Sequence, residues 1–279
     1  MLSSGIPMAW AFQCKTTPVI MGILNVTPDS FSDGGRHRST EDAVDHARLM
    51  IEEGADIIDV GGESTRPFSE PVAEKEEIRR VIPVIERLHE IPGAFISVDT
   101  YKANVAREAL KAGADMVNDI SGLTYDDAMA GVIAGNDAHA VIMHIKGTPR
   151  NMQENPWYDD VVGEISAFLH ERVEYAVRSG VDREKIVIDP GIGFGKRVED
   201  NLRILKMLRA FHELGRPVLI GTSMKSFIGK LTDMPLEERV EGTLASLAVA
   251  IMNGADVLRV HDVRGAKKVL KIVKAVMDA

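Results

Sequence analysis

The chain has 279 residues, of which 45% are hydrophobic and 27% are charged, as is typical of a globular protein. Its formal net charge of −9 disfavours nucleic acid and anionic membranes as partners, so an anionic ligand would need local basic groups. The single cysteine, Cys14, can form no internal disulfide, and no basic leader or run of about eighteen apolar residues is present, which together predict a cytoplasmic protein without a membrane span.

Three stretches of the sequence share one pattern. They read EEGADIIDVGG (52–62), KAGADMVNDISG (111–122) and MNGADVLRVHD (252–262). Each fits a helix that ends at a glycine, a two-residue turn, and a short apolar strand that stops at a polar residue. The pattern predicts helices and strands that alternate with very short connections.

The other predicted elements continue this alternation in chain order. Residues 1–17 lie outside it and are expected to form an N-terminal extension. Closing the bottom of the barrel is one role open to this extension. Apolar runs predict further strands at 18–25, 94–99, 139–144, 186–189 and 217–222. Amphipathic runs predict helices near 40–53, 74–90, 102–112, 126–134, 157–179, 200–213, 237–253 and 264–278.

This alternation favours a single-domain α/β fold over residues 18–279. Eight strand–helix units in about 250 residues match a (β/α)8 TIM barrel in count and length. A doubly wound open sheet has the same local pattern and is the competing architecture. No linker or shift in composition divides the chain, so we expect one barrel.

Every predicted strand ends on a hydrogen-bonding or charged residue. In chain order these are Asn25, Asp59, Asp99, Asn118, His144, Asp189, the Ser223/Lys225 pair, and Arg259 with His261. One such residue is equally well explained as a cap of the next helix. In a barrel, however, all of them face one end, and buried polar groups without a partner are costly. The set predicts a cavity for a nitrogen-rich heterocycle and an anion.

Two long segments after predicted strands lack helical or strand periodicity. They are VTPDSFSDGGRHRS (26–39) and GGESTRPFSEPVAE (61–74). They are open to interpretation as solvated loops, but loops of this length in a tightly connected barrel are commonly lids or substrate loops.

The stretch IVIDPGIGFGK (186–196) has the glycine density of a phosphate-binding loop. It fails the P-loop pattern, because Pro190 occupies a required glycine position and Arg197 a required serine or threonine position. It fails the dinucleotide fingerprint at Lys196, which would have to be glycine. GTSMK (221–225) is not a nucleophile elbow either. A carboxylate pair for glycoside hydrolysis is disfavoured, because only 5% of the residues are aromatic.

A resemblance to a known family rests on blocks that occur in order between about residues 18 and 270. They are GILNVTPDSFSDGG, IIDVGGESTRP, SVDTYK, VNDISG, DPGIGFGK, SMKSFIG and LRVHDV. Together they resemble the dihydropteroate synthases of the folate pathway. The resemblance implies a homodimeric (β/α)8 transferase that is a sulfonamide target. Such enzymes use magnesium and join p-aminobenzoate to 6-hydroxymethyl-7,8-dihydropterin pyrophosphate, with release of pyrophosphate.

The resemblance also implies roles for single residues. The pterin ring would be bound by Asp99, Asn118, Asp189 and Lys225. The pyrophosphate would be held by Asn25, Arg259 and protonated His261, with Asn25 also near the metal. The p-aminobenzoate pocket would consist of Thr65, Arg66, Pro67, Phe194, Ser223 and Lys225. The catalytic set would be Asp33, Lys225, Arg259 and His261, with Asp33 and the second loop closing over the reacting centre, and no covalent nucleophile is expected.

The glycine-rich stretch takes a different meaning under this resemblance. Its glycines would let the backbone pass close to a flat ligand, and Phe194 would turn its ring toward the aryl amine. Lys196 has no assigned role and is expected to be solvated.

One position departs from the family pattern, and two other functions compete with this interpretation. Met224 replaces the usual arginine of a Ser-Arg-Lys-Ser block, which removes a planar cation. A pterin-dependent methyltransferase would share the ring-binding positions but has no need of the pyrophosphate-holding blocks. A pterin-binding barrel without catalytic activity is the second alternative, and Met224 is the only feature of the sequence that suggests it.

Overall fold

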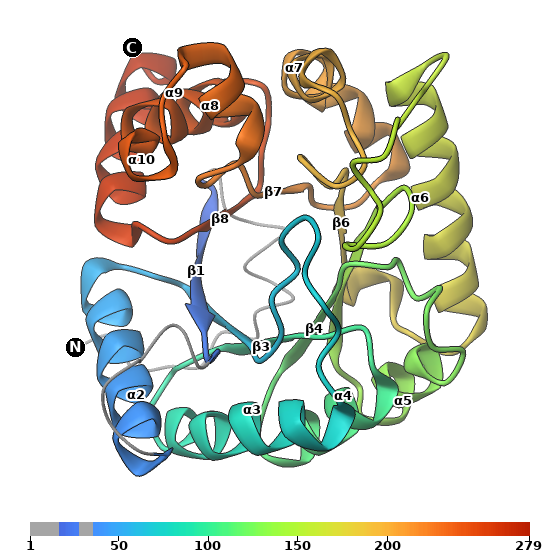
Figure 1. The fold of residues 1–279 in the computed structure, drawn as a ribbon, viewed down its shortest axis with the longest axis vertical. Helices are drawn as coiled ribbons and strands as arrows, with labels where there is room; N and C mark the ends of the chain where they lie inside the picture. Colours follow the sequence, from blue (N-terminus) through green and yellow to red (C-terminus); the bar gives the residue numbers. More distant parts are fainter. Residues whose placement is uncertain (1–16, 28–35) are drawn as a thin grey trace.

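Eight parallel strands form the centre of the molecule, and helices surround them (Figure 1). The structure is a computed structural model that describes residues 17–27 and 36–279. The strands are β1 (Val19–Asn25), β2 (Ile57–Gly61), β3 (Ile96–Asp99), β4 (Met116–Asp119), β5 (His139–Met143), β6 (Ile186–Asp189), β7 (Leu219–Ile220) and β8 (Val257–Val260). Their hydrogen-bonded order is β6-β5-β4-β3-β2-β1-β8-β7, and a parallel bridge between Ile188 and Val218 joins the two edges. The predicted barrel is confirmed, and the open sheet is excluded.

The helices follow the strands in alternation. They are α2 (Arg36–Glu53), α3 (Glu74–His89), α4 (Ala103–Lys111), α5 (Met129–Gly135), α6 (Val161–Arg178), α7 (Val198–Lys206), α8 (Ser226–Thr232), α9 (Val240–Met252) and α10 (Val263–Met277). Short 3-10 helices are η2 (Arg183–Lys185), η3 (Leu208–Leu214) and η4 (Leu236–Glu238). Among the helices described, none is long and apolar enough to cross a membrane.

The C-terminal third differs most from the predicted elements. The run expected as one helix over 200–213 is divided into α7 and η3. The strand expected over 217–222 is only β7, because the chain turns after it: Lys225 N–H donates to the Thr222 carbonyl, and the unpredicted helix α8 begins at Ser226. Of the predicted extension 1–17, only Thr17 lies within the described residues.

The repeated Gly-Ala-Asp pattern fixes both the turns and the strand register. Its glycines, Gly54, Gly113 and Gly254, adopt φ values of 103°, 109° and 96°, the left-handed conformation that ends a helix. Its aspartates each accept a hydrogen bond from the backbone N–H of an adjacent chain segment: Asp56 from Ile20 (2.9 Å), Asp115 from Ile96 (2.9 Å) and Asp256 from Val218 (2.7 Å). Each Gly-Ala-Asp unit thus ends a helix through its glycine and aligns two neighbouring strands through its aspartate.

An apolar plug fills the lower part of the barrel. It consists of Val19, Met21, Ile57, Met116, Val141, Val187, Leu219 and Val257. Side chains two positions apart on a strand point to the same side, so the next inward residue on several strands lies directly above the plug. Those residues are Asp59 on β2, Asn118 on β4, Asp189 on β6 and Arg259 on β8. The plug therefore supports a polar floor.

Candidate active site

A cavity of about 550 Å³ opens at the carboxyl ends of the strands. Every predicted site residue within the described part of the chain lines it: Asn25, Thr65, Arg66, Pro67, Asp99, Asn118, Asp189, Phe194, Ser223, Lys225, Arg259 and His261. Asp33 lies outside the described residues. The elements are far apart in the sequence, so the barrel itself brings these side chains together.

Arg259 is the centre of the cavity floor. Its Nε donates to Asp59 Oδ2 at 2.6 Å, and its Nη2 donates to Asp99 Oδ2 at 2.6 Å. Asn118 Nδ2 donates to the same Asp59 oxygen at 3.0 Å. One guanidinium thus serves two buried carboxylates, and burial together with the Asp59 charge raises the pKa of Asp99 to about 7 in spite of Arg259. Asp59, expected at a strand end, lies inside the barrel and is fully buried, because β2 continues to Gly61.

Asp189 and Lys225 form the second charged group of the floor. Asp189 Oδ1 accepts from the Gly191 N–H at 2.6 Å, and burial raises the pKa of Asp189 to about 6. The Lys225 ammonium lies 3.9 Å from the centre of the Phe194 ring, a cation–π contact. Burial and the Arg259 charge lower the pKa of Lys225 to about 8. The aromatic ring predicted to face the aryl amine therefore packs against a cation.

His261 and Ser223 lie together at the cavity wall. Ser223 Oγ is 2.8 Å from His261 Nδ1, and the backbone N–H of His261 donates to the same hydroxyl at 3.4 Å. The surrounding protein and the Arg259 guanidinium lower the pKa of His261 to about 4, although the residue is open at the cavity mouth. The imidazole is therefore neutral at pH 7 unless an anion binds beside it, and the protonated His261 expected against pyrophosphate stays a prediction.

The second loop carries Thr65, Arg66 and Pro67 to the cavity mouth. Glu63, which the sequence analysis did not single out, lies at its base and is 7% exposed. It accepts from the Val72 N–H at 2.7 Å and from the Tyr101 hydroxyl at 2.5 Å, and it forms an ion pair with Lys102. These contacts tie the two ends of the loop together. The only sequence signal was that Glu63 belongs to the GGEST block.

Met224 stands between the cavity and an adjoining apolar hollow. It lines both the main cavity and a neighbouring one of about 400 Å³, whose walls include Val240, Leu244 and Leu247. Its backbone has φ 60°, and its carbonyl accepts from Arg239 Nη1 at 3.3 Å. Arg239, which no sequence pattern indicated, also lines the main cavity. Position 224 therefore borders the site in which the family pattern places a guanidinium.

The glycine-rich stretch after β6 packs differently from the sequence interpretation. Lys196, expected to be solvated, is 3% exposed. A side chain at Gly191 would collide with the His144 carbonyl, and one at Gly195 with the Lys146 carbonyl. Gly191 and Gly195 thus make room for the backbone of residues 144–146 rather than for a ligand. Of the three glycines, Gly193 alone lines the cavity.

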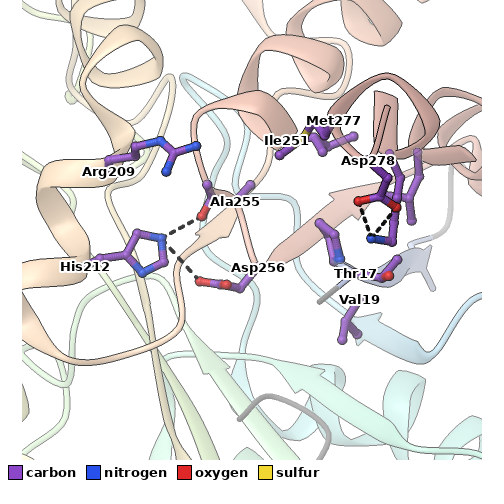
Figure 2. A pocket seen from close by; sticks show the side chains of 13 residues that line it. Thr17, Val19, Arg209, His212, Ile251, Ala255, Asp256, Met277 and Asp278 are labelled. Carbon is purple, nitrogen blue, oxygen red and sulfur yellow. Dashed lines mark hydrogen bonds and ion pairs between the residues drawn. The ribbon is translucent and has the colours of Figure 1, made fainter. Parts of the chain in front are cut away.

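A further cavity, of about 380 Å³, is lined by Thr17 and Val19 at the start of β1 and so lies at the end of the barrel opposite the main cavity. Figure 2 shows residues that line it. Its polar groups have partners within the protein: His212 Nε2 lies 2.7 Å from the Gly254 carbonyl and 3.7 Å from Asp256, Arg209 donates to the Met252 carbonyl at 3.0 Å, and Lys274 pairs with Asp278 at 2.9 Å. This end of a TIM barrel serves stability rather than catalysis. The predicted site residues line the other cavity.

The cavity offers few oxygen donors to the expected metal. Within residues 17–27 and 36–279, no three His, Cys, Asp or Glu side chains gather as a metal site. Asn25 Oδ1 and Asp99 Oδ2 both lie within 4 Å of the position that a Gly61 side chain would occupy, but Asp99 Oδ2 already accepts from Arg259 Nη2, so Asn25 Oδ1 is the oxygen available to a metal at this point. Mg²⁺ commonly uses one or two protein oxygens together with substrate phosphates and water. The donor set fits a magnesium ion that arrives with its substrate.

Comparison with known proteins extends over most of the chain. Residues 21–261 match the family model described as "Pterin binding enzyme". The chain is 49% identical over 272 residues to the dihydropteroate synthase of Bacillus subtilis, and the aligned region covers 98% of this chain and 92% of that protein.

Two solved structures show the same fold. The Yersinia pestis dihydropteroate synthase in complex with a sulfonamide drug superposes with a TM-score of 0.89 at 42% identity, over 95% of this chain and 96% of that one. The Xanthomonas albilineans enzyme in complex with 7,8-dihydropteroate gives 0.85 at 44% identity, over 95% of each chain. Sequence, fold and cavity agree, and the chain belongs to the dihydropteroate synthase family of pterin-binding enzymes, which are transferases of folate synthesis.

Proposed function

We propose that the cavity at the carboxyl ends of the strands joins p-aminobenzoate to 6-hydroxymethyl-7,8-dihydropterin pyrophosphate and releases pyrophosphate. The observation that carries the proposal is the polar floor, in which carboxylates and an amide lie next to two cationic groups. A pterin with a charged leaving group has matching chemistry at its two ends. The family relationship supports the same reaction.

The pterin ring is assigned to Asp189, Asn118 and Asp99, with Lys225 beside them. A carboxylate facing adjacent N–H donors of the 2-amino-4-oxo edge forms paired hydrogen bonds, and an amide serves the mixed edge. All three side chains are at least nine-tenths buried, so the exchange of water for ring atoms is favourable only if these groups find partners. That requirement selects a flat, nitrogen-rich ligand.

Pyrophosphate is assigned to Arg259, His261 and Asn25. Arg259 engages its Nε and Nη2 with carboxylates, which leaves further N–H groups of the guanidinium for phosphate oxygens. An arriving anion raises the pKa of His261, so the imidazole that is neutral in the free protein gains a proton on binding. These groups stabilise the charge that develops as the C–O bond breaks.

The reaction needs no covalent nucleophile. The electron pair of the C–O bond leaves with pyrophosphate, and the Asp99 and Asp189 carboxylates stabilise the positive charge on the pterin. The lone pair of the aryl amine then forms the new C–N bond, and the amine nitrogen releases its proton to water. Asn25 would hold Mg²⁺ through its side-chain oxygen, and the metal would neutralise charge on the leaving pyrophosphate.

The p-aminobenzoate side of the cavity is assigned to Thr65, Arg66, Pro67, Phe194, Ser223 and Lys225. Phe194 offers an apolar face, whereas Arg66 supplies a cation at the mouth for the carboxylate of the substrate. A sulfonamide presents an aryl amine of similar shape, and we therefore expect it to compete with p-aminobenzoate here.

The test is an assay of pyrophosphate release with the pterin pyrophosphate, p-aminobenzoate and Mg²⁺. We expect release that requires the amine and the metal. Tight pterin binding without release would support the inactive pterin-binding barrel, and methyl transfer from methyltetrahydrofolate to cobalamin would support the methyltransferase. A cytoplasmic location and a homodimer stay predictions from the sequence, and light scattering of the purified protein tests the second.

A further inference from the structure

Lys196 has a buried ammonium at the end of the loop between β6 and α7. Its Nζ contacts three acceptors: the Phe194 carbonyl at 3.0 Å, the His144 carbonyl at 3.3 Å and His144 Nδ1 at 3.0 Å. Burial lowers the pKa of Lys196 to about 7. The ammonium that exists below this pH has three N–H donors, and these contacts account for all of them when the His144 ring accepts at Nδ1. A lysine is almost never buried without a specific arrangement of this kind. The contacts therefore indicate a built feature of the loop.

His144 is a fixed acceptor for this ammonium. The residue is 7% exposed, and burial together with the Lys196 charge lowers the pKa of His144 to about 2. A neutral ring that accepts at Nδ1 carries its proton on Nε2. Phe168 packs edge-on against the ring at 4.9 Å between centres, and Tyr158 lies at 6.0 Å. The ring is thus held with Nδ1 toward Lys196.

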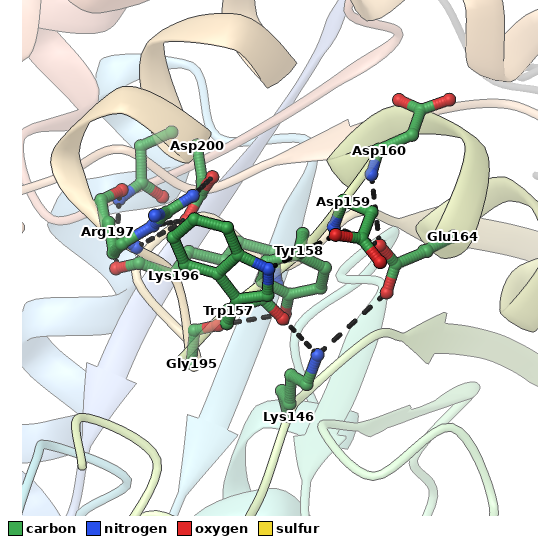
Figure 3. A network of polar contacts seen from close by, with 11 residues as sticks. Lys146, Trp157, Tyr158, Asp159, Asp160, Glu164, Gly195, Lys196, Arg197 and Asp200 are labelled. Atoms are coloured by element: carbon green, nitrogen blue, oxygen red, sulfur yellow. Dashed lines mark hydrogen bonds and ion pairs between the residues drawn. The ribbon is translucent and has the colours of Figure 1, made fainter. Parts of the chain in front are cut away.

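Further contacts hold the same loop: Gln153 Nε2 donates to the Gly193 carbonyl and the Gly193 N–H donates to Asn201 Oδ1, each at 2.7 Å. Others lie on its outer side (Figure 3). The Tyr158 hydroxyl donates to the Gly195 carbonyl at 2.8 Å, and Arg197 forms a double hydrogen bond with Asp200 at 2.9 Å while its guanidinium lies 4.4 Å from the Trp157 ring. At the start of the loop the His144 N–H donates to the Asp189 carbonyl at 2.9 Å, and at its end Lys196 joins the loop to the same residue, His144, which follows β5. Residues 190–196 are consequently clamped against the segment that begins at His144.

The clamped loop shapes both halves of the active cavity. Phe194 is the residue whose carbonyl Lys196 holds and whose ring lies under the Lys225 ammonium. A side chain at Gly193 would be 3.0 Å from Lys225 Cδ, so the loop backbone and Lys225 are in close contact. On the other side, the Gly191 N–H donates to Asp189. A shift of residues 193–196 would therefore move the Phe194 ring, and with it the p-aminobenzoate side of the cavity.

We propose that Lys196 is a positioning residue for the transferase reaction, because it holds the Phe194 carbonyl against His144 and thereby places the Phe194 ring for p-aminobenzoate. The inference rests on the proposed function. Lys196 does not line the cavity, so its effect passes through the loop. Its positive charge has a second consequence, since it stabilises the nearby Asp189 carboxylate.

The test compares Lys196→Met with Lys206→Met, an exposed lysine on α7. For Lys196→Met we expect the KM for p-aminobenzoate to rise at least tenfold, while pterin affinity at pH 8 stays within threefold of wild type. Lys206→Met should match wild type in both. A merely structural role would reduce the active fraction of the protein without moving this KM, and that result would overturn the proposal.

A pH profile gives a second readout. The charged groups that act on Asp189 are Lys225, Lys196 and Arg259, and those that act on Lys196 are Asp189, Lys225, Asp200 and Lys146. Loss of the Lys196 cation should move the acid limb of pterin binding to higher pH. An unchanged limb together with an unchanged KM for p-aminobenzoate would refute the proposal.

His144 variants keep the proposal testable if Lys196→Met does not fold. The Oδ1 of His144→Asn replaces the Nδ1 acceptor, whereas His144→Phe retains the ring packing and removes the acceptor. We expect the KM for p-aminobenzoate to rise in His144→Phe and to stay within threefold in His144→Asn. Equal KM values in the two variants would contradict the role of this contact. Wild-type protein without pyrophosphate release would instead contradict the proposed function itself.

Discussion

The Arg259 guanidinium lies 2.6 Å from the Asp99 carboxylate, so a residue assigned to pyrophosphate and one assigned to the pterin are bound to each other. Asp59 shares the same guanidinium from the other side. This arrangement orients Arg259 before any ligand arrives, because two fixed carboxylates determine the plane of one rigid cation. Binding of the leaving group and of the ring is therefore coupled through one side chain.

Arg259→Lys tests this coupling. An ammonium retains the charge but cannot present the planar fork that bridges two carboxylates. We expect kcat/KM for the pterin pyrophosphate to fall about 100-fold, which is typical of the loss of one aligned donor to a developing anion. Steady-state kinetics measure this, with the exposed Arg264→Lys on α10 as the matched control. Activity of Arg259→Lys within threefold of the control would contradict the assignment.

Asp189 gives the site a pH dependence. The pKa of this carboxyl is about 6, and only its ionised form accepts two N–H bonds from the ring. The contribution of Asp189 to pterin affinity should be constant above about pH 7 and should fall about tenfold per pH unit well below pH 6. The same raised pKa lowers stability as the pH rises from about 4 to about 6, because the folded chain retains a proton that the unfolded chain releases.

Calorimetric titration of the pterin between pH 5 and pH 8 checks the direction. Asp99 also titrates in this range, so the matched measurement is the same series with Asp189→Asn, which keeps the side-chain shape. The difference between the two profiles reports Asp189 alone. If the wild-type and variant profiles have the same slope below pH 6, Asp189 is not the titrating acceptor.

The barrel and the position of its cavity could be predicted from the sequence because both follow from local periodicity. Two-residue alternation along β2 and β8 places Asp59 and Arg259 on the inside once the plug residues before them are known. Which polar groups pair could not be predicted, since Asp59 and Arg259 are 200 positions apart. Lys196 shows the limit most clearly. Its acceptor ring belongs to His144, 52 positions earlier, and no local pattern distinguishes a lysine that folds inward from a solvated one.

Met224, which stands where the family pattern has arginine, lines the cavity. A substitution at this position can therefore test whether the missing arginine matters for substrate binding. Met224→Arg adds a cation near the mouth, and we expect the KM for the p-aminobenzoate anion to fall about two- to tenfold as a result, in line with a partly exposed charge pair. The apolar Met224→Leu is the control for side-chain size. Steady-state kinetics at low and at high salt separate the effects, because a gain from charge weakens with salt. Identical KM values for the two variants would show that position 224 does not influence this substrate.

Lys102 connects two buried carboxylates at the base of the second loop. Its ammonium is ion-paired with Glu63 and Glu77 and donates to the Val72 carbonyl at 2.8 Å, and burial raises the pKa of Glu77. Lys102→Met leaves both carboxylates without their cation. Removal of one partner of a buried ion pair costs about 3–5 kcal/mol, so the free energy of unfolding should fall by an amount of this order.

The same substitution should act on catalysis through the loop. Val72 is released from Lys102, and Glu63 loses the cation that fixes it against the Val72 N–H. Thr65 and Arg66 then lose their fixed position, and the KM for p-aminobenzoate should rise more than the Kd of the pterin. Lys111→Met is the matched control, because Lys111 forms an exposed pair with Glu108 whose loss costs less than about 1 kcal/mol. Urea unfolding and steady-state kinetics on both variants decide the matter: if Lys102→Met unfolds like Lys111→Met and keeps the wild-type KM, the buried cluster does not anchor the loop.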